Sequence, residues 1–114
     1  MTSQPSFATM PEKTVFIVNV MHCHEGKQAQ TLAAIDAVVR YVAQAKPGFR
    51  WSTLARSTDG DTVGNIEAIS GVDDVEAFFA DSEFRRLWER VGKVSRHEFH
   101  TYAADAVILP GADR

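Results

Sequence analysis

The segment from Lys46 to Phe79 constrains the fold more than any other part of the chain, because it joins two strand patterns through a tight turn. The Pro47-Gly48 pair ends a helical pattern, and residues 49–56 then alternate in apolar character, as a half-buried strand does. The Asp59-Gly60 pair tolerates the positive φ of a hairpin turn, and residues 62–70 carry the returning strand pattern. This segment therefore predicts an antiparallel hairpin.

The returning strand carries polar and apolar side chains on the same face. Side chains two residues apart project to the same side of a strand, so Asn65, Glu67 and Ile69 are expected to lie together. A polar amide beside an apolar neighbour is typical of a ligand cleft as well as of a solvated surface. This strand supplies the first candidate site residues.

The remaining segments complete an alternating pattern of strands and helices. They are an apolar strand over 14–22, an amphipathic helix over 26–45, a short helix from Asp73, a second helix from Asp81 or Ser82 to a stop at Gly92, and a closing strand over 95–107 with a bulge expected within 103–107. The order β-α-β-β-α-β predicts an α+β fold with a four-stranded antiparallel sheet, the ferredoxin-like split arrangement. We expect one domain over residues 14–110, a flexible arm over 1–13 and a tail over 111–114.

One face of this sheet is expected to remain bare in a single chain. Helices on one side leave Phe16, Val18 and Val20 of the first strand on the other, which is more contiguous apolar surface than a soluble monomer usually exposes. Two sheets are therefore expected to stack face to face in a homodimer.

Charge and cysteine content exclude several classes of protein. The net charge is −3, and the 12 Lys and Arg residues are scattered without a basic stripe, so no nucleic-acid partner is expected. The single Cys23 cannot form an internal disulfide, which fits a cytoplasmic protein. No apolar run approaches the roughly 20 residues of a membrane span, so no membrane partner is expected.

The chain resembles the antibiotic biosynthesis monooxygenase family of dimeric α+β barrels over residues 15–109. The resemblance rests on an apolar first strand with Asn19, the Pro47-Gly48-Phe49 turn, and the hairpin that leads to Asn65. It is nearest to the cofactor-independent anthrone monooxygenases of aromatic polyketide pathways. Because strand amides are functional in this family, the resemblance implies catalytic roles for Asn65 and Asn19. Two positions depart from relatives, since Ile69 replaces a frequent Trp and Trp88 replaces the haem-binding His of haem-degrading members.

No nucleotide, flavin, haem or metal motif accompanies these amides, so we expect no cofactor and take molecular oxygen as the co-substrate. An anthrone or naphthol that loses a proton becomes an anion able to give an electron to oxygen, on the way to a quinone. Asn65 and Asn19 are predicted to donate hydrogen bonds to that anion. Glu67, if it is buried, is predicted to act as the base.

Candidate substrate-binding residues come from several elements. Trp51 is predicted to replace the aromatic wall missing at Ile69, and Arg86 to reach a phenolate or carboxylate. The other candidates are Phe78, Trp88 and His22. His22 and His24 have chelating spacing but no third ligand, so no metal site is predicted.

Two other functions fit the same sequence. A polyketide cyclase or isomerase also stabilises an enolate but transfers no electron. A non-catalytic small-molecule-binding or stress-response protein would use the pocket without chemistry.

Overall fold

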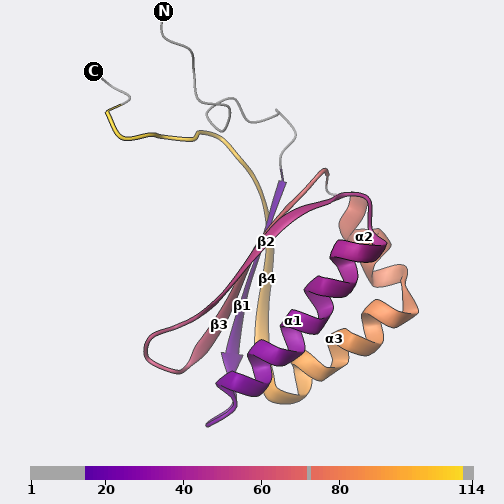
Figure 1. Cartoon of the computed structure of the whole chain (residues 1–114), viewed down its shortest axis with the longest axis vertical. Coiled ribbons are helices and arrows are strands. Elements are labelled where there is room, and N and C mark those ends of the chain that lie inside the picture. The colour runs from indigo at the N-terminus through magenta and orange to yellow at the C-terminus, as the bar shows by residue number, and fades with distance from the viewer. Residues whose placement is uncertain (1–14, 72, 112–114) are drawn as a thin grey trace, which may run out of the picture.

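A computed structural model describes residues 15–71 and 73–111, which form a four-stranded antiparallel sheet with helices on one face (Figure 1). The strands are β1 (Val15–Cys23), β2 (Phe49–Arg56), β3 (Thr62–Ile69) and β4 (Ser95–Ala103). The helices are α1 (Gln28–Ala45), α2 (Asp73–Ala80) and α3 (Ser82–Val94). The strand order β2-β3-β1-β4 has every neighbouring pair antiparallel, so the predicted α+β, ferredoxin-like fold is confirmed.

Alternation along the central strand β1 separates the two faces of the sheet. Ile17, Asn19 and Met21 are buried beneath the helices, whereas Phe16 and Val18 project to the opposite face and are only half-buried. The sequence predicts this division. Among the described residues, the helices all lie on one face of the sheet and leave the other face open, as Figure 1 shows.

The helices cover the sheet with apolar stripes at helical spacing. Helix α1 buries Ile35, Val38, Val39 and Val42, and α3 buries Phe84, Leu87 and Val91. These side chains pack with the helix-facing residues of β1 and β3 in one core. No helix of the described residues is long and apolar enough to cross a membrane.

Asp81 fixes the junction of α2 and α3. Its Oδ1 accepts hydrogen bonds from the backbone N–H groups of Glu83 and Phe84, at 2.9 and 3.2 Å, as a helix N-cap does. Its Oδ2 accepts from Tyr41 Oη and Lys46 Nζ, both at 2.6 Å. The junction is thereby tied to the C-terminal end of α1.

The β2–β3 hairpin forms as predicted and sets the register of the candidate site. Gly60 has a positive φ of 84°, and the Ser57 N–H donates to the Thr62 carbonyl at 3.0 Å. The strands then pair Leu54 with Asn65. An irregularity between Phe49 and Trp51 shifts the start of β2.

Two predicted boundaries are wrong. Helix α3 does not stop at Gly92, which lacks the positive φ of a helix-ending glycine, and it continues to Val94. Strand β4 ends at Ala103, opposite Val15 at the first described position of β1, so the predicted strand and bulge over 104–107 do not form. The predicted arm over 1–13 and residues 112–114 of the predicted tail lie outside the described residues.

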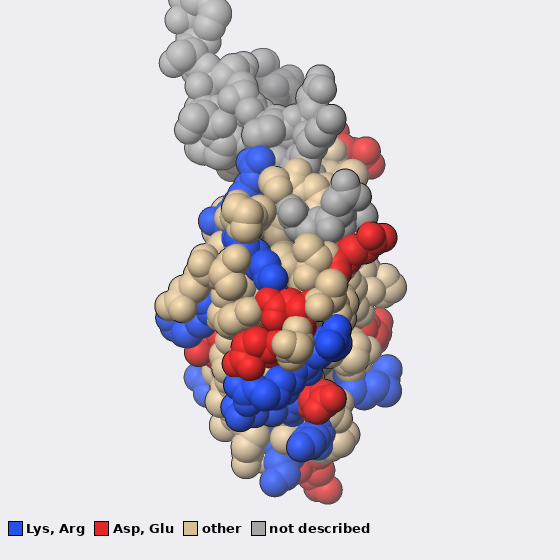
Figure 2. Space-filling view, turned by 90° about the vertical axis from the view of Figure 1, so that its right-hand side faces the viewer, with Lys and Arg blue, Asp and Glu red and all other residues tan. Residues whose placement is uncertain are grey.

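Charged side chains on the face shown in Figure 2 are mixed in sign. Basic and acidic residues are interspersed over the surface of the helices and do not gather into one patch. On the helices, Arg86 pairs with Glu83 and Arg40 pairs with Asp36.

Candidate active site

Three buried polar side chains gather on the helix-facing side of β1 and β3. Asn19 pairs with Asn65 across the two strands, and Glu67 lies two residues further along β3. Only 2% of Asn19, 2% of Asn65 and 4% of Glu67 is exposed. Because polar groups are costly to bury, three of them together under apolar helices make this place a candidate functional site.

These side chains line a small cavity between the sheet and the helices. Its volume is about 20 Å³, enough for about one water molecule. The rest of its wall is apolar: Ile17, Ile35, Val38, Val39, Phe78, Phe84, Trp88 and Phe99. The cavity therefore combines a polar floor on the sheet with an apolar roof.

A hydrogen-bonded chain runs along the polar floor. Ser52 Oγ donates to Asn65 Oδ1 at 2.5 Å, and Asn65 Nδ2 donates to Glu67 Oε1 at 3.5 Å. Asn19 Oδ1 is buried, and among the described residues it has no hydrogen-bond partner. An unpaired buried carbonyl is costly, so Asn19 is ready to accept a hydrogen bond from a ligand.

Burial changes the acidity of Glu67. Loss of solvent raises the pKa of this carboxyl from 4.5 to about 7, although the hydrogen bond from Asn65 opposes the shift. A carboxyl with a pKa near neutrality exchanges protons readily at physiological pH. Glu67 is therefore suited to proton transfer beside two amides.

Aromatic side chains close the cavity from the side of α2, α3 and β4. The rings of Phe84 and Trp88 stack with centroids 5.9 Å apart, and Phe79 meets Trp88 and Phe99 edge to face at 6.0 and 5.9 Å. Phe79 is 37% exposed, so this aromatic wall reaches the protein surface.

The structure brings five predicted site residues together and places four elsewhere. Asn19, Asn65, Glu67, Phe78 and Trp88 line the cavity. Ile69 shares the face of Asn65 but is fully buried in the core and does not line the cavity.

The predicted position of Trp51 is wrong. Trp51 pairs with Ala68 on the open face of the sheet, is 46% exposed and packs against Phe16 with ring centroids 6.0 Å apart. It therefore supplies no aromatic wall beside Asn65.

His22 and Arg86 also lie away from the cavity. His22 Nε2 is 2.5 Å from Glu98 Oε1 on the open sheet face, and Arg86 pairs with Glu83 at 2.6 Å on the exposed side of α3. Because both are committed to surface partners, neither contacts the polar floor.

Sequence reasoning missed Ser52 and two aromatic rings that line the cavity, Phe84 and Phe99. Ser52 shares its strand face with Leu54, so alternation along β2 contained the signal, but the pairing of Ser52 with Glu67 becomes visible only from the register with β3. In the sequence, Phe84 and Phe99 fit the apolar patterns of a helix and a strand, which do not by themselves indicate a place at the site. Their shared cavity depends on how α3 and β4 meet.

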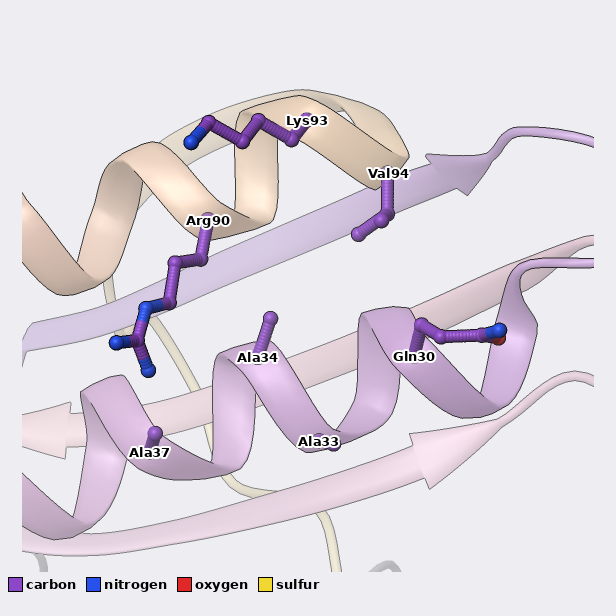
Figure 3. Close-up of a pocket in the computed structure, with 7 residues that line it drawn as sticks. All are labelled: Gln30, Ala33, Ala34, Ala37, Arg90, Lys93 and Val94. Carbon is purple, nitrogen blue, oxygen red and sulfur yellow. The ribbon is translucent and has the colours of Figure 1, made fainter.

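Among the described residues, two further hollows lie outside the cavity. One, of about 400 Å³ between α1 and α3, has a floor of alanines, and Arg90 extends from α3 toward α1 (Figure 3). The other, of about 220 Å³, lies between α1 and β2 and includes Ser52 in its lining. The larger hollow shares no lining residue with the cavity.

Metal ligands do not converge in the described part of the chain. No group of three His, Cys, Asp or Glu side chains in residues 15–71 and 73–111 is placed to hold a metal ion. His22 pairs with Glu98, and His24 follows the end of β1 in an exposed position.

Comparison with known proteins finds solved structures of similar fold. No protein-family model and no curated protein matches the chain. The structure of SnoaB, a cofactor-independent oxygenase from Streptomyces nogalater, matches with a TM-score of 0.76 at 24% identity, over 86% of this chain and 98% of SnoaB. A SnoaB variant with one asparagine replaced by alanine also has a TM-score of 0.76, at 23% identity over the same shares.

A candidate antibiotic biosynthesis monooxygenase from Caulobacter crescentus extends the comparison. It matches with a TM-score of 0.71 at 16% identity, over 82% of this chain and 91% of that protein. At these identities the likeness concerns the fold. The chain thus has the fold of the antibiotic biosynthesis monooxygenases, as the sequence resemblance predicts.

Proposed function

We propose that this protein is a cofactor-independent monooxygenase that oxidises an electron-rich phenolic aromatic, an anthrone or naphthol of a polyketide pathway, to a quinone. The observation that supports this most is a buried carboxyl with a pKa near 7 beside two buried amides in an apolar cavity. SnoaB, which has the same fold, is described as a cofactor-independent oxygenase. The single Cys23 is compatible with a cytoplasmic reaction.

The chemistry begins with removal of a proton from the substrate. Glu67 accepts this proton, and the side-chain N–H groups of Asn65 and Asn19 donate hydrogen bonds to the resulting oxyanion. The electron-rich anion gives one electron to dioxygen, and the two radicals combine at carbon to form a peroxide. The peroxide O–O bond then breaks: one oxygen atom remains as the new carbonyl, and the other leaves as water. Substrate and oxygen supply all the electrons.

An aromatic substrate needs more room than the closed cavity offers. A volume of about 20 Å³ does not hold a ring. Phe79, Trp88 and Phe99 lie between the cavity and the surface, so we assign entry to rotation of these rings. The substrate ring would then stack where the wall rings now meet each other.

Oxygen consumption by the purified protein with anthrones such as dithranol tests the proposal. We expect uptake by the wild type to survive chelators, and Asn65→Ala to lower kcat by about 10² to 10³ while the melting temperature changes little. Asn19→Ala is expected to act in the same direction. Gln44→Ala, which removes an exposed amide from α1, serves as the matched control. No uptake across several anthrones and naphthols would refute the oxygenase proposal.

A cyclase or isomerase function is the second candidate. Glu67 and the two amides suffice for enolisation, and the buried Ile69 adds no aromatic side chain at the position where many relatives carry a Trp. Turnover of a polyketide substrate under strict anaerobiosis would favour this second function. Binding of such compounds without any turnover would favour a non-catalytic role.

A further inference from the structure

We propose that Ser52 is a positioning residue that fixes the orientation of the Asn65 amide, so that its N–H groups face Glu67 and the cavity. This inference rests on the proposed function for its catalytic meaning. The contacts that position Asn65 do not depend on the proposed reaction. Ser52 lies on the edge strand β2, half-buried, opposite Glu67 in the β2–β3 register.

The Asn65 amide has two ends with opposite hydrogen-bonding character. Its Oδ1 accepts from Ser52 Oγ at 2.5 Å, and its Nδ2 donates to Glu67 Oε1 at 3.5 Å. An amide nitrogen carries two N–H donors, so one remains for a ligand after Glu67 has been satisfied. Because Asn65 lines the cavity, that second donor is available to a developing oxyanion there.

The reversed orientation is worse when Glu67 is ionised. Turning the amide by 180° would place Oδ1 against the carboxylate, where two acceptors have no proton between them. Ser52 can accept or donate, but only donation is compatible with an Asn65 N–H directed at Glu67. The carboxylate therefore selects this orientation, and the serine hydroxyl holds it from the opposite side by donating to Oδ1.

Few other charges bear on this chain of hydrogen bonds. Among the described residues lining the cavity, from β1, β3, β4 and the three helices, Glu67 is the only titratable one. On the outer side of Ser52, the groove between α1 and β2 contains Asp36 and Arg40, which are paired with each other at 2.9 Å. The charge state of Glu67 is thus set mainly by its burial and by Asn65.

Substitutions at Ser52 test the effect of its hydroxyl group separately from the effect of its side-chain volume. Ser52→Thr keeps a hydroxyl and Ser52→Val replaces it by a methyl group of similar size, so this pair differs chiefly in the hydrogen bond. Ser52→Ala is the third variant, and Thr58→Ala in the exposed β2–β3 turn removes a hydroxyl elsewhere as a control. The Thr and Val pair decides the result if Ser52→Ala fails to fold.

The first measurement needs no substrate. Carbon-13 NMR of the Glu67 carboxyl follows its titration in the full chain. In Ser52→Val and Ser52→Ala only Glu67 still orients the amide, so an N–H is held at the carboxylate less firmly and the titration midpoint should move upward by about half a unit or more. Ser52→Thr and Thr58→Ala should titrate like the wild type. An unchanged midpoint in both hydroxyl-free variants would overturn the proposal.

The second measurement uses turnover. With an active anthrone substrate, Ser52→Val should lower kcat about tenfold or more with little change in KM, and the acid limb of the pH profile should move upward with the Glu67 midpoint. Restoration by Ser52→Thr would support positioning by the hydroxyl. If wild type consumes no oxygen while the NMR midpoint still shifts, the oxygenase proposal fails and the positioning role stands.

Discussion

At the scale of single residues, the Glu67 carboxyl links the candidate function to the stability of the fold. Its pKa is about 7 in the folded protein and near 4.5 when exposed, so the folded state binds the proton more tightly. The contribution of Glu67 to the unfolding free energy is therefore fully present below pH 4.5 and is lost as pH rises through about 7. A difference of about 2.5 units corresponds to about 3 kcal/mol of unfolding free energy lost by pH 8.

Glu67→Gln should remove this loss. We expect the unfolding free energy of the variant, relative to wild type, to rise between pH 4.5 and pH 8 by up to about 3 kcal/mol, because a neutral amide has no proton to release. Urea denaturation at several pH values measures the difference. Glu89→Gln on the exposed side of α3 is the control. Parallel pH dependences of the unfolding free energy for wild type and Glu67→Gln would show that burial does not raise the pKa of the Glu67 carboxyl.

Residue identities at the site were predictable to different degrees. The shared face of Asn65 and Glu67 follows from the two-residue period of a strand, and the structure confirms it. The error at Trp51 arose because alternation within one strand does not say which face the helices cover. That choice depends on the pairing of Trp51 with Ala68, after the irregularity near the start of β2.

At the scale of elements, Asp81 connects three helices and carries a further prediction. Hydrogen bonds from Lys46 and Tyr41 hold the pKa of this carboxyl below its usual range. Its stabilising contribution is therefore present above the unfolded pKa of about 3.8 and is lost as pH falls below that value. The same carboxylate caps α3.

Asp81→Ala should lower the melting temperature at pH 7 by several degrees, because it removes the cap and the bonds to α1 together. Thermal unfolding followed by circular dichroism measures this. The deficit should begin to shrink as pH falls below about 3.8 toward 3, because the unfolded carboxyl then binds a proton that the folded Asp81 carboxyl does not. Asp59→Ala, in the exposed hairpin turn, is a control that keeps the helix junction. A deficit in melting temperature that does not change with pH would argue against stabilisation by the ionised Asp81 carboxylate.

Element types were predictable because the segments are long and their hydrophobic periods are clear, whereas the two boundary errors have local causes. At Gly92 the helix continues because Val91 is buried and Ser95 Oγ donates to the Val91 carbonyl at 2.7 Å, which ties the end of α3 to the start of β4. At Ala103 the strand ends where its pairing with β1 reaches Val15. Neither cause can be seen in the hydrophobic pattern of the segment itself.

At the scale of the whole molecule, the open face of the sheet exposes several large apolar side chains. Trp51 and Ile66 are each 46% exposed there, and Tyr102 is 51% exposed. They lie across from the half-buried Phe16 and Val18 of β1 on the same face. The Trp51 side chain, absent from the cavity, therefore belongs to a contiguous apolar face. We propose that a second copy of this chain covers that face.

Such a dimer should bury well over roughly 1,000 Å² in total, the range of stable interfaces. A positive charge placed in the centre of an apolar interface is desolvated without a partner, so Ile66→Lys should convert the dimer to monomers at micromolar concentration. Sedimentation velocity measures the change. Gln44→Lys, which adds the same charge on exposed α1, should remain dimeric. Because Ile66 points away from the cavity, the Glu67 titration should persist in the monomeric variant if each site is complete within one chain. A wild-type protein that sediments as a monomer would contradict the proposed assembly.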